Sequence, residues 1–530
     1  MNRLRVLATS VALLALVLTV PAGGAFAGTA THQAPKQLTH FQPLAPQSRL
    51  GRSHANRSPN AGTVDCTRSY STNADVNMDC ASTIAPNNEM QIAVDPNDSN
   101  HMIASSNDYE SCCDEFYTTF DGGFTWQSGD MSNEGGDIFG SDPASAISKQ
   151  TGTAFHISLN IANDLSFSDV VVSRSLDGGL VWDAPVLVDH SAGALFNDKE
   201  WITVDNSPSS PFYGRIYATW TRFNGTAAQN SPIFMSYSSD DGLTWTTRKM
   251  ISGNSKALCT YQAGGPANAC DEDQFSVPSV GPDGTVYVNF INEQNTALWE
   301  PGEVFDDQIL VVHSTNGGVK WTSPAMAASL EDGSLDYPIN VDGRQTLTGE
   351  QMRLGQNTSG VAGITAGSVY VVWSDNRNGV HDSSNPVTNS DVFIASSTDK
   401  GNTWSAPQQV TTNGADQWQA WMDIDPVTGR LGVVYFDRGY GDPSLYDLTY
   451  ARTGGGGGFH YERVTTRPSD PTHSFFFQAG VPGCEQCSRF IGDYIGIAFG
   501  SNGAANITWT DMRKEFRMHG HLEHGFFSRR

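Results

Sequence analysis

The segment Ser397-Thr-Asp399-Lys-Gly401-Asn-Thr403-Trp404 decides the fold, because the chain contains five versions of it. The shared pattern is Ser/Thr-x-Asp-x-Gly-x-Thr-Trp, with Asn316 in place of Asp and with Val181 and Lys320 in place of Thr. The other four copies cover residues 119–126, 175–182, 238–245 and 314–321. An eight-residue pattern that recurs in this way indicates a repeat architecture.

The pattern predicts a hairpin turn. Its Asp is expected to cap turn amides, its Gly to supply a positive φ, and its Trp to pack beneath the turn. We interpret the five segments as structural, because their residues are used up in satisfying the turn.

A second repeated unit lies between these segments, and it consists of two short apolar runs joined by a tight turn such as Gly281-Pro-Asp-Gly284. The seven pairs of runs are 89–94 with 101–104, 144–147 with 153–157, 201–204 with 215–220, 275–280 with 285–290, 351–356 with 368–373, 421–424 with 431–436, and 494–499 with 504–509. A hairpin that contains the eight-residue motif, called a box hairpin below, follows each of the first five pairs. After the sixth pair, residues 446–450 and 459–464 form a hairpin without the motif.

Two strands and a hairpin make a four-stranded antiparallel blade, so the sequence predicts an all-β, seven-bladed β-propeller. Strands from residues 61–84 are expected to close the last blade. A six-bladed propeller is the alternative, if one terminal unit is not a full blade.

The first 60 residues are expected to lie outside this domain. Arg3 and Arg5 precede an apolar run over residues 6–20, and Ala25-Phe26-Ala27 is an A-x-A cleavage site, so residues 1–27 predict a signal peptide. Residues 28–60 predict a disordered linker, and residues 61–530 a single propeller domain. No second apolar span of membrane length follows, so we expect a secreted, extracellular protein with no membrane span.

Export makes the eight cysteines candidates for disulfide bonds. Cys484-Glu-Gln-Cys487 has zinc-ligand spacing, but no second CxxC and no paired histidines complete a tetrahedral site. A disulfide is favoured there, the connectivity of the eight stays open, and no metal site is assigned.

The net charge of −25 argues against nucleic acid or an anionic membrane as partner, since both bind basic surfaces. The excess of carboxylates is compatible with calcium binding, although no dedicated calcium loop is present. We expect a monomer that requires no cofactor.

Blade geometry assigns the functional face. The box turns share one face with the tight turns, whereas the loops after second strands and between blades share the other. That second face receives the long segments 106–117, 246–274, 292–307, 323–349, 374–391 and 465–491. Binding sites are built from long loops on a rigid scaffold, so we expect the face opposite the boxes to be functional.

Charged residues gather at the same face. The acidic residues at or just before the first strands are Glu89, Asp142, Asp198, Glu200, Asp273, Glu350, Asp416 and Asp493. Just after second strands come Asp375-Asn-Arg377, Asp437-Arg438 and Asp511-Met-Arg513. The functional interpretation is a polar cup with carboxylates for acid/base chemistry and arginines that clamp an anion. The architectural interpretation, favoured for any single Asp–Arg motif, is an ion pair or turn cap.

The five repeats resemble the Asp box, or BNR repeat, of the sialidase superfamily and other Asp-box propellers, and the resemblance spans roughly residues 85–513. It implies a glycoside hydrolase with an arginine triad on the substrate carboxylate, a Tyr nucleophile activated by Glu, and an Asp acid/base. The family's first arginine lies in a Phe/Tyr-Arg-Ile-Pro motif. The corresponding region here reads Glu89-Met-Gln-Ile-Ala and contains no arginine.

We therefore choose candidate residues by their position on the predicted functional face rather than by a motif match. The catalytic candidates are Asp114, Glu350, Asp493 and Tyr494, and the substrate-binding candidates are Arg353, Arg377, Arg438, Arg489, Arg513, Glu89, Asp142 and Glu200. The expected function is hydrolysis of terminal sialic acid or another glycan residue. The alternatives are a non-catalytic glycan- or protein-binding propeller, and a polysaccharide lyase on the same scaffold.

Overall fold

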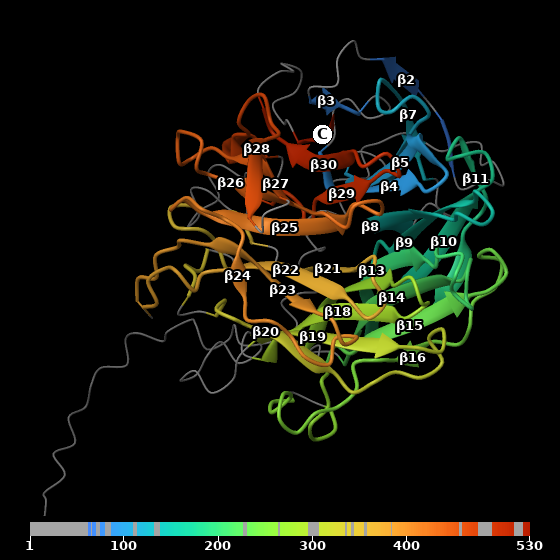
Figure 1. Cartoon of the computed structure of the whole chain (residues 1–530), viewed down its shortest axis with the longest axis horizontal. Coiled ribbons are helices and arrows are strands. Elements are labelled where there is room, and N and C mark those ends of the chain that lie inside the picture. Colours follow the sequence, from blue (N-terminus) through green and yellow to red (C-terminus); the bar gives the residue numbers. More distant parts are fainter. Residues whose placement is uncertain are drawn as a thin grey trace, which may run out of the picture.

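The computed structural model is a seven-bladed β-propeller whose blades radiate from one central axis (Figure 1). It describes residues 62–64, 66–69, 75–79, 86–109, 114–131, 138–225, 230–262, 265–294, 307–333, 336–340, 344–354, 358–382, 384–454, 458–474, 490–513 and 523–530. The predicted blade number is confirmed, and the six-bladed alternative is wrong. In these segments no helix has the length and apolar character needed to span a membrane.

The inner strands of neighbouring blades contact one another around a closed ring. These first strands are β4 (Asn87–Asp95), β8 (Ile138–Ile147), β13 (Leu195–Val204), β17 (Asp273–Val280), β21 (Thr358–Ala362), β25 (Gln417–Ile424) and β29 (Gly496–Phe499). The second strands are β5 (Asp98–Asp108), β9 (Ala154–Ala162), β14 (Ile216–Asn224), β18 (Val286–Asn292), β22 (Val369–Asp375), β26 (Leu431–Asp437) and β30 (Ala505–Asp511).

The two outer strands of each blade form the hairpins. The third strands are β6 (Glu115–Thr119), β10 (Ser168–Ser175), β15 (Ile233–Ser238), β19 (Asp307–Ser314), β23 (Asp391–Ser397), β27 (Asp447–Thr453) and β31 (His524–Arg529). The fourth strands are β7 (Thr125–Asp130), β12 (Val186–Asp189), β16 (Lys249–Met250), β20 (Ala325–Leu330), β24 (Gln408–Gln409), β28 (Phe459–Arg463) and β3 (Val76–Asn77).

Residues near the start of the propeller close the last blade, as predicted. In β3, Val76 pairs with Phe527 of β31 and Asn77 pairs with Phe526. Two further short strands extend other blades: β2 (Cys66–Ser69) pairs with β7, and β1 (Gly62–Thr63) pairs with β11 (Val181–Trp182). The pairing of β3 with β31 joins residues near the two ends of the described chain in one sheet and so closes the ring of blades.

The box turns have the predicted chemistry. Ser397 Oγ accepts the Gly401 N–H at 2.9 Å, and Asp399 Oδ1 accepts the Thr403 N–H at 2.9 Å. Gly401 has φ of 78°, and the Trp404 indole donates to the Gly401 carbonyl at 3.0 Å. These bonds hold the pKa of the Asp399 carboxyl at about 2, with the Thr403 hydroxyl as the largest cause. The stability that this carboxylate contributes is therefore present above its unfolded pKa and lost as pH falls towards 2.

Replacing Gly401 with Ala is expected to lower the free energy of unfolding by about 1–2 kcal/mol, the usual penalty for a Cβ in the left-handed region. The space itself tolerates a methyl group, since the nearest atom outside the turn is Val311 Cγ1 at 3.4 Å. Urea denaturation would measure the change. Gly414→Ala is the matched control, because a Cβ there meets nothing within 4 Å and its φ is outside the left-handed range. Equal stabilities for the two variants would contradict a conformational role for Gly401.

One strand prediction was wrong. The first run of the fifth blade was expected at residues 351–356, whereas β21 spans Thr358–Ala362. Residues 351–354 lie in irregular structure, and Met352 and Leu354 are buried in the hydrophobic core. Their apolar alternation therefore reflects core packing rather than a strand ladder.

A disulfide is confirmed between Cys259 and Cys270, whose Cα atoms lie 5.1 Å apart. The predicted leader, the linker and the Cys484–Cys487 segment lie outside the described residues.

Candidate functional site

The inner strands β4, β8, β13, β17 and β25 each contain a β-bulge near the start. One residue of every bulge has a left-handed backbone: Glu89 (φ 59°), Asp142 (φ 59°), Lys199 (φ 51°), Phe275 (φ 55°) and Gln419 (φ 55°). None of them is glycine, so each conformation is strained by about 1–3 kcal/mol. Bulges re-aim side chains, and here several of these side chains meet at the axis on the face opposite the box turns.

Blade 7 has a glycine at the corresponding place. Gly492 has φ of 88°, and a Cβ there would lie only 2.6 Å from the Glu89 backbone nitrogen. The Gln419 side-chain amide donates to the Gly492 carbonyl at 2.6 Å. Close backbone packing therefore continues around the axis between blades 6, 7 and 1.

An ion cluster occupies the axis. Lys199 Nζ lies 2.9 Å from Asp142 Oδ2, 2.9 Å from Asp493 Oδ2 and 3.3 Å from Glu89 Oε1. All four side chains are at most 5% exposed. With Arg353, which donates to Asp493, they form what we call the axial cluster. It joins blades 1, 2, 3 and 7 through one ammonium group.

Further hydrogen bonds orient the carboxylates. The Asp493 N–H donates to Glu89 Oε1 at 3.1 Å, and Asn107 Nδ2 donates to Glu89 Oε2 at 3.1 Å. The Ser141 hydroxyl donates to Asp142 Oδ1 at 2.7 Å. Both oxygens of Glu89 are thus positioned before any ligand arrives, as a catalytic group requires.

Two carboxyl groups of the cluster have pKa values displaced in opposite directions. Burial, followed by repulsion from Asp142, raises the pKa of Glu89 well above its ordinary value. Burial would also raise the pKa of Asp493, but Arg353 and Lys199 outweigh it and hold that pKa below the ordinary range. Two neighbouring carboxyl groups whose pKa values are displaced in opposite directions are an arrangement that acid/base catalysis uses.

Two arginines act on Asp493, Arg353 by direct contact and Arg344 electrostatically. The Arg353 guanidinium lies 4.2 Å from the centre of the Phe490 ring, and at 8% its side chain is the most exposed of the cluster. Arg344 interacts electrostatically with Glu293 and Asp493, and burial lowers its pKa to about 10. Poorly hydrated guanidinium groups favour an anionic partner.

Aromatic rings from three blades pack together near the cluster. Trp201, Trp421 and Tyr494, each two residues beyond a bulge position, belong to blades 3, 6 and 7. Their ring centroids lie 4.8, 5.1 and 6.0 Å apart. The Tyr494 hydroxyl donates to the Pro143 carbonyl at 2.9 Å, and burial raises its pKa well above the ordinary value. Tyr494 therefore packs within this cluster of three aromatic rings.

Glu200 and Asp114 lie in a second buried acidic group. Neither oxygen of Glu200 has a hydrogen-bond partner within the described part of the chain, and burial and then Asp142 raise its pKa. Asp114 Oδ2 lies 3.4 Å from His156 Nε2, and burial raises the pKa of Asp114. Asp114 also acts electrostatically on Glu200, so this group adjoins the axial cluster through Asp142.

The remaining arginine candidates are bound elsewhere. Arg377 donates to Asp375 and lies 4.4 Å from the Phe393 ring. Arg513 pairs with Asp511 and Asp75, whereas Arg438 lies 3.3 Å from Asp416 and 3.6 Å from Glu350. These contacts follow the architectural interpretation of the Asp–Arg motifs. Arg489 lies outside the described residues.

Lys199 was missed by the sequence reasoning, which considered only acidic residues at these positions. A signal was present, because Asp198-Lys199-Glu200 contains a lysine where the other inner strands begin with acidic or uncharged residues. Trp201 and Trp421 were assigned to apolar runs, and their meeting across the axis follows only from the closed ring.

Potential metal ligands gather in one other place. Ligand atoms of Glu331, Asp336 and His381 all lie within 4.8 Å of one another, and among the described residues no other group of three histidine, cysteine or carboxylate ligands is as close. This group lies on loops outside the axial cluster.

No family model and no curated protein matches this chain. Among solved structures, it is similar to a Hadza microbial sialidase, with 14% identity and a TM-score of 0.40. The similarity covers 66% of this chain and 63% of that chain, so this chain spans less than two thirds of that protein's length. It is also similar to a leech intramolecular trans-sialidase, with 12% identity over 72% of this chain and 70% of that chain, at a TM-score of 0.44. A GH93 α-L-arabinofuranosidase of Fusarium graminearum shares 13% identity over 75% of this chain and 97% of that chain, at a TM-score of 0.41.

Proposed function

We propose that this chain is a glycoside hydrolase whose active site is the axial cluster. The observation that supports this most directly is the contact of Glu89 and Asp493 with the same lysine, while their pKa values are displaced in opposite directions. Glycoside hydrolysis uses two carboxyl groups, one protonated and one ionised, on either side of the scissile bond.

Each residue of the cluster then has a role. Glu89 donates its proton to the leaving oxygen as the glycosidic bond breaks, and Asp493 stabilises the positive charge that develops at the anomeric carbon. A water molecule then adds to that carbon and gives one proton back to Glu89. Lys199 holds both carboxyl groups in place. We assign these roles to carboxylates rather than to a Tyr494 nucleophile, because the Tyr494 hydroxyl is engaged with Pro143.

The substrate class follows from the arginines. Arg353 and Arg344 offer positive charge beside Asp493, so the proposed substrate carries a carboxylate, with a terminal sialic acid as the first candidate. The sugar is proposed to approach from Arg353, the most exposed side chain of the cluster.

A non-catalytic glycan-binding propeller is the second candidate. It is favoured by the near-complete burial of the axial cluster and by the engagement of Arg377, Arg438 and Arg513 in ion pairs. In that case the axial cluster would only hold the blades together.

A panel of fluorogenic glycosides that includes sialosides and uronides, together with a glycan array, separates the two candidates. Turnover of a glycoside with an anionic sugar is the expected result. Glycan binding without turnover would establish the second candidate, and the absence of both binding and turnover would overturn both.

A further inference from the structure

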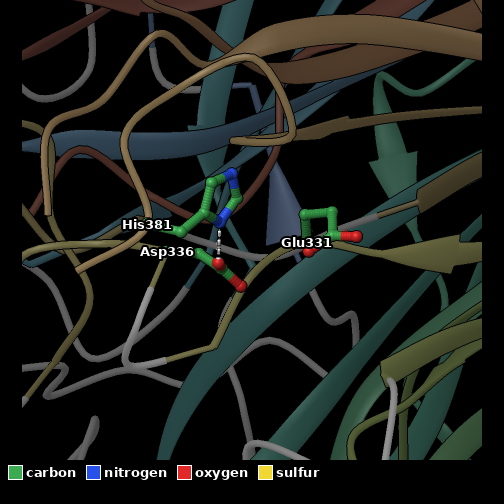
Figure 2. Close-up of side chains that lie close together, drawn as sticks. All are labelled: Glu331, Asp336 and His381. Atoms are coloured by element: carbon green, nitrogen blue, oxygen red, sulfur yellow. Dashed lines mark hydrogen bonds and ion pairs between the residues drawn. The ribbon is translucent and has the colours of Figure 1, made fainter. Parts of the chain in front are cut away.

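Two loops on the proposed functional face bring an imidazole and two carboxylates together. Glu331 directly follows β20, and Asp336 lies five residues further along the connection from blade 4 to blade 5. His381 lies in the loop between β22 and β23. Figure 2 shows the imidazole joined to Asp336, with the Glu331 side chain beside the pair.

We propose that Glu331, Asp336 and His381 bind a zinc ion. Their ligand atoms lie within 4.8 Å of one another, close enough for one ion to reach all three. One imidazole nitrogen and two carboxylate oxygens form a donor set that suits Zn²⁺, and three protein ligands leave a coordination position for water.

The loops are held in place around these ligands. Asp336 Oδ2 accepts the Gly333 N–H at 2.8 Å, which leaves Oδ1 directed at His381 Nδ1. The Asn376 N–H donates to the Glu331 carbonyl at 3.0 Å, and the Asn376 side chain donates to the Asp336 carbonyl. Asn376 therefore connects the two loops, and such outer contacts orient metal ligands.

The site brings two carboxylates and one imidazole together, and like charges this close repel each other. The exposed Glu331 carboxylate makes no hydrogen bond and no ion pair with any residue that the structure describes, whereas Asp336 contacts His381. Arg377 acts electrostatically on Glu331, but its guanidinium is bound to Asp375. A divalent cation would relieve this repulsion.

Zinc binding to the full chain can be measured by calorimetry or by competition with a colorimetric zinc indicator. We expect one tight site in the wild type, and a loss of affinity of more than about 100-fold in H381Q and in E331Q, since even outer-shell partners contribute about 10–100-fold. Glu331 is exposed, so E331Q is expected to fold normally.

His190→Gln is the matched control. His190 Nδ1 lies 2.6 Å from Asp169 Oδ1, so this exposed pair has the same His–Asp contact, but it belongs to no three-ligand group among the described residues. H190Q should bind zinc like the wild type. Equal affinities in wild type, H381Q and E331Q would overturn the proposal, and so would displacement of zinc by an equimolar amount of calcium, which prefers oxygen-only sites.

Discussion

Replacing Glu89 with Gln is expected to lower kcat/KM towards the cleaved glycoside by about 10²- to 10⁴-fold, the usual contribution of a general acid. Gln keeps the shape of the neutral carboxyl group and can still accept the Asp493 N–H, but it has no acidic proton to transfer to the leaving oxygen. Because the Glu89 pKa is raised, kcat/KM of the wild type should fall as pH rises through that pKa. This basic limb should be absent in E89Q. Initial rates across pH measure both effects.

Asp423→Asn is the control for E89Q. Asp423 is a partly buried carboxyl group with a pKa raised to about 6, but it accepts the Phe499 N–H and has no hydrogen bond or ion pair with the axial cluster among the described contacts. Its replacement should leave kcat/KM near the wild-type value. Full activity in E89Q would remove the acid role from Glu89, and full activity in both E89Q and D493N would exclude the axial cluster as the active site.

Replacing Lys199 with Met is expected to lower the free energy of unfolding by about 3–5 kcal/mol, because it leaves buried carboxylates without their cation. Burial alone would lower the pKa of Lys199, but Asp142, Asp493 and Glu89 raise it well above the ordinary value. The stabilisation is therefore fully present below the unfolded pKa of the lysine and is lost as pH rises beyond it. Urea denaturation at pH 7 measures the loss.

Two comparisons identify the cause of the K199M effect. Lys400→Met removes a half-exposed ion pair with Asp283 and should change the free energy of unfolding by less than about 1 kcal/mol. In K199M the carboxylates can take up protons, so its deficit should shrink between pH 7 and pH 5, and adding D142N should recover part of the stability. A deficit that is independent of pH would indicate lost packing instead of charge.

The repeated segments made the fold predictable. Five box turns and seven paired runs determine the number of blades, and strand alternation then determines which loops share a face. The early residues were also recognisable as a closing strand. The box turns and the closing strand are local sequence patterns, and the number of blades follows from counting the repeats.

The axial cluster was only partly predictable. Glu89, Asp142 and Asp493 were expected near one another, since each was assigned to a position at or just before a predicted inner strand. The bulges could not be foreseen, because left-handed conformations at Glu89, Asp142 and Lys199 have no glycine to mark them. Without the bulges, the sequence does not show which carboxylates converge on the lysine and which pair with arginines of their own blade.

The packing of Trp201, Trp421 and Tyr494 has a consequence for how substrate and product reach and leave the axial cluster. Their rings pack against one another beside the axial cluster. We therefore propose that a sugar enters and leaves on the side of Arg353, the most exposed side chain of the cluster. A hydrolysed sugar and the next substrate must therefore compete for the same opening, and product inhibition is expected to accompany turnover.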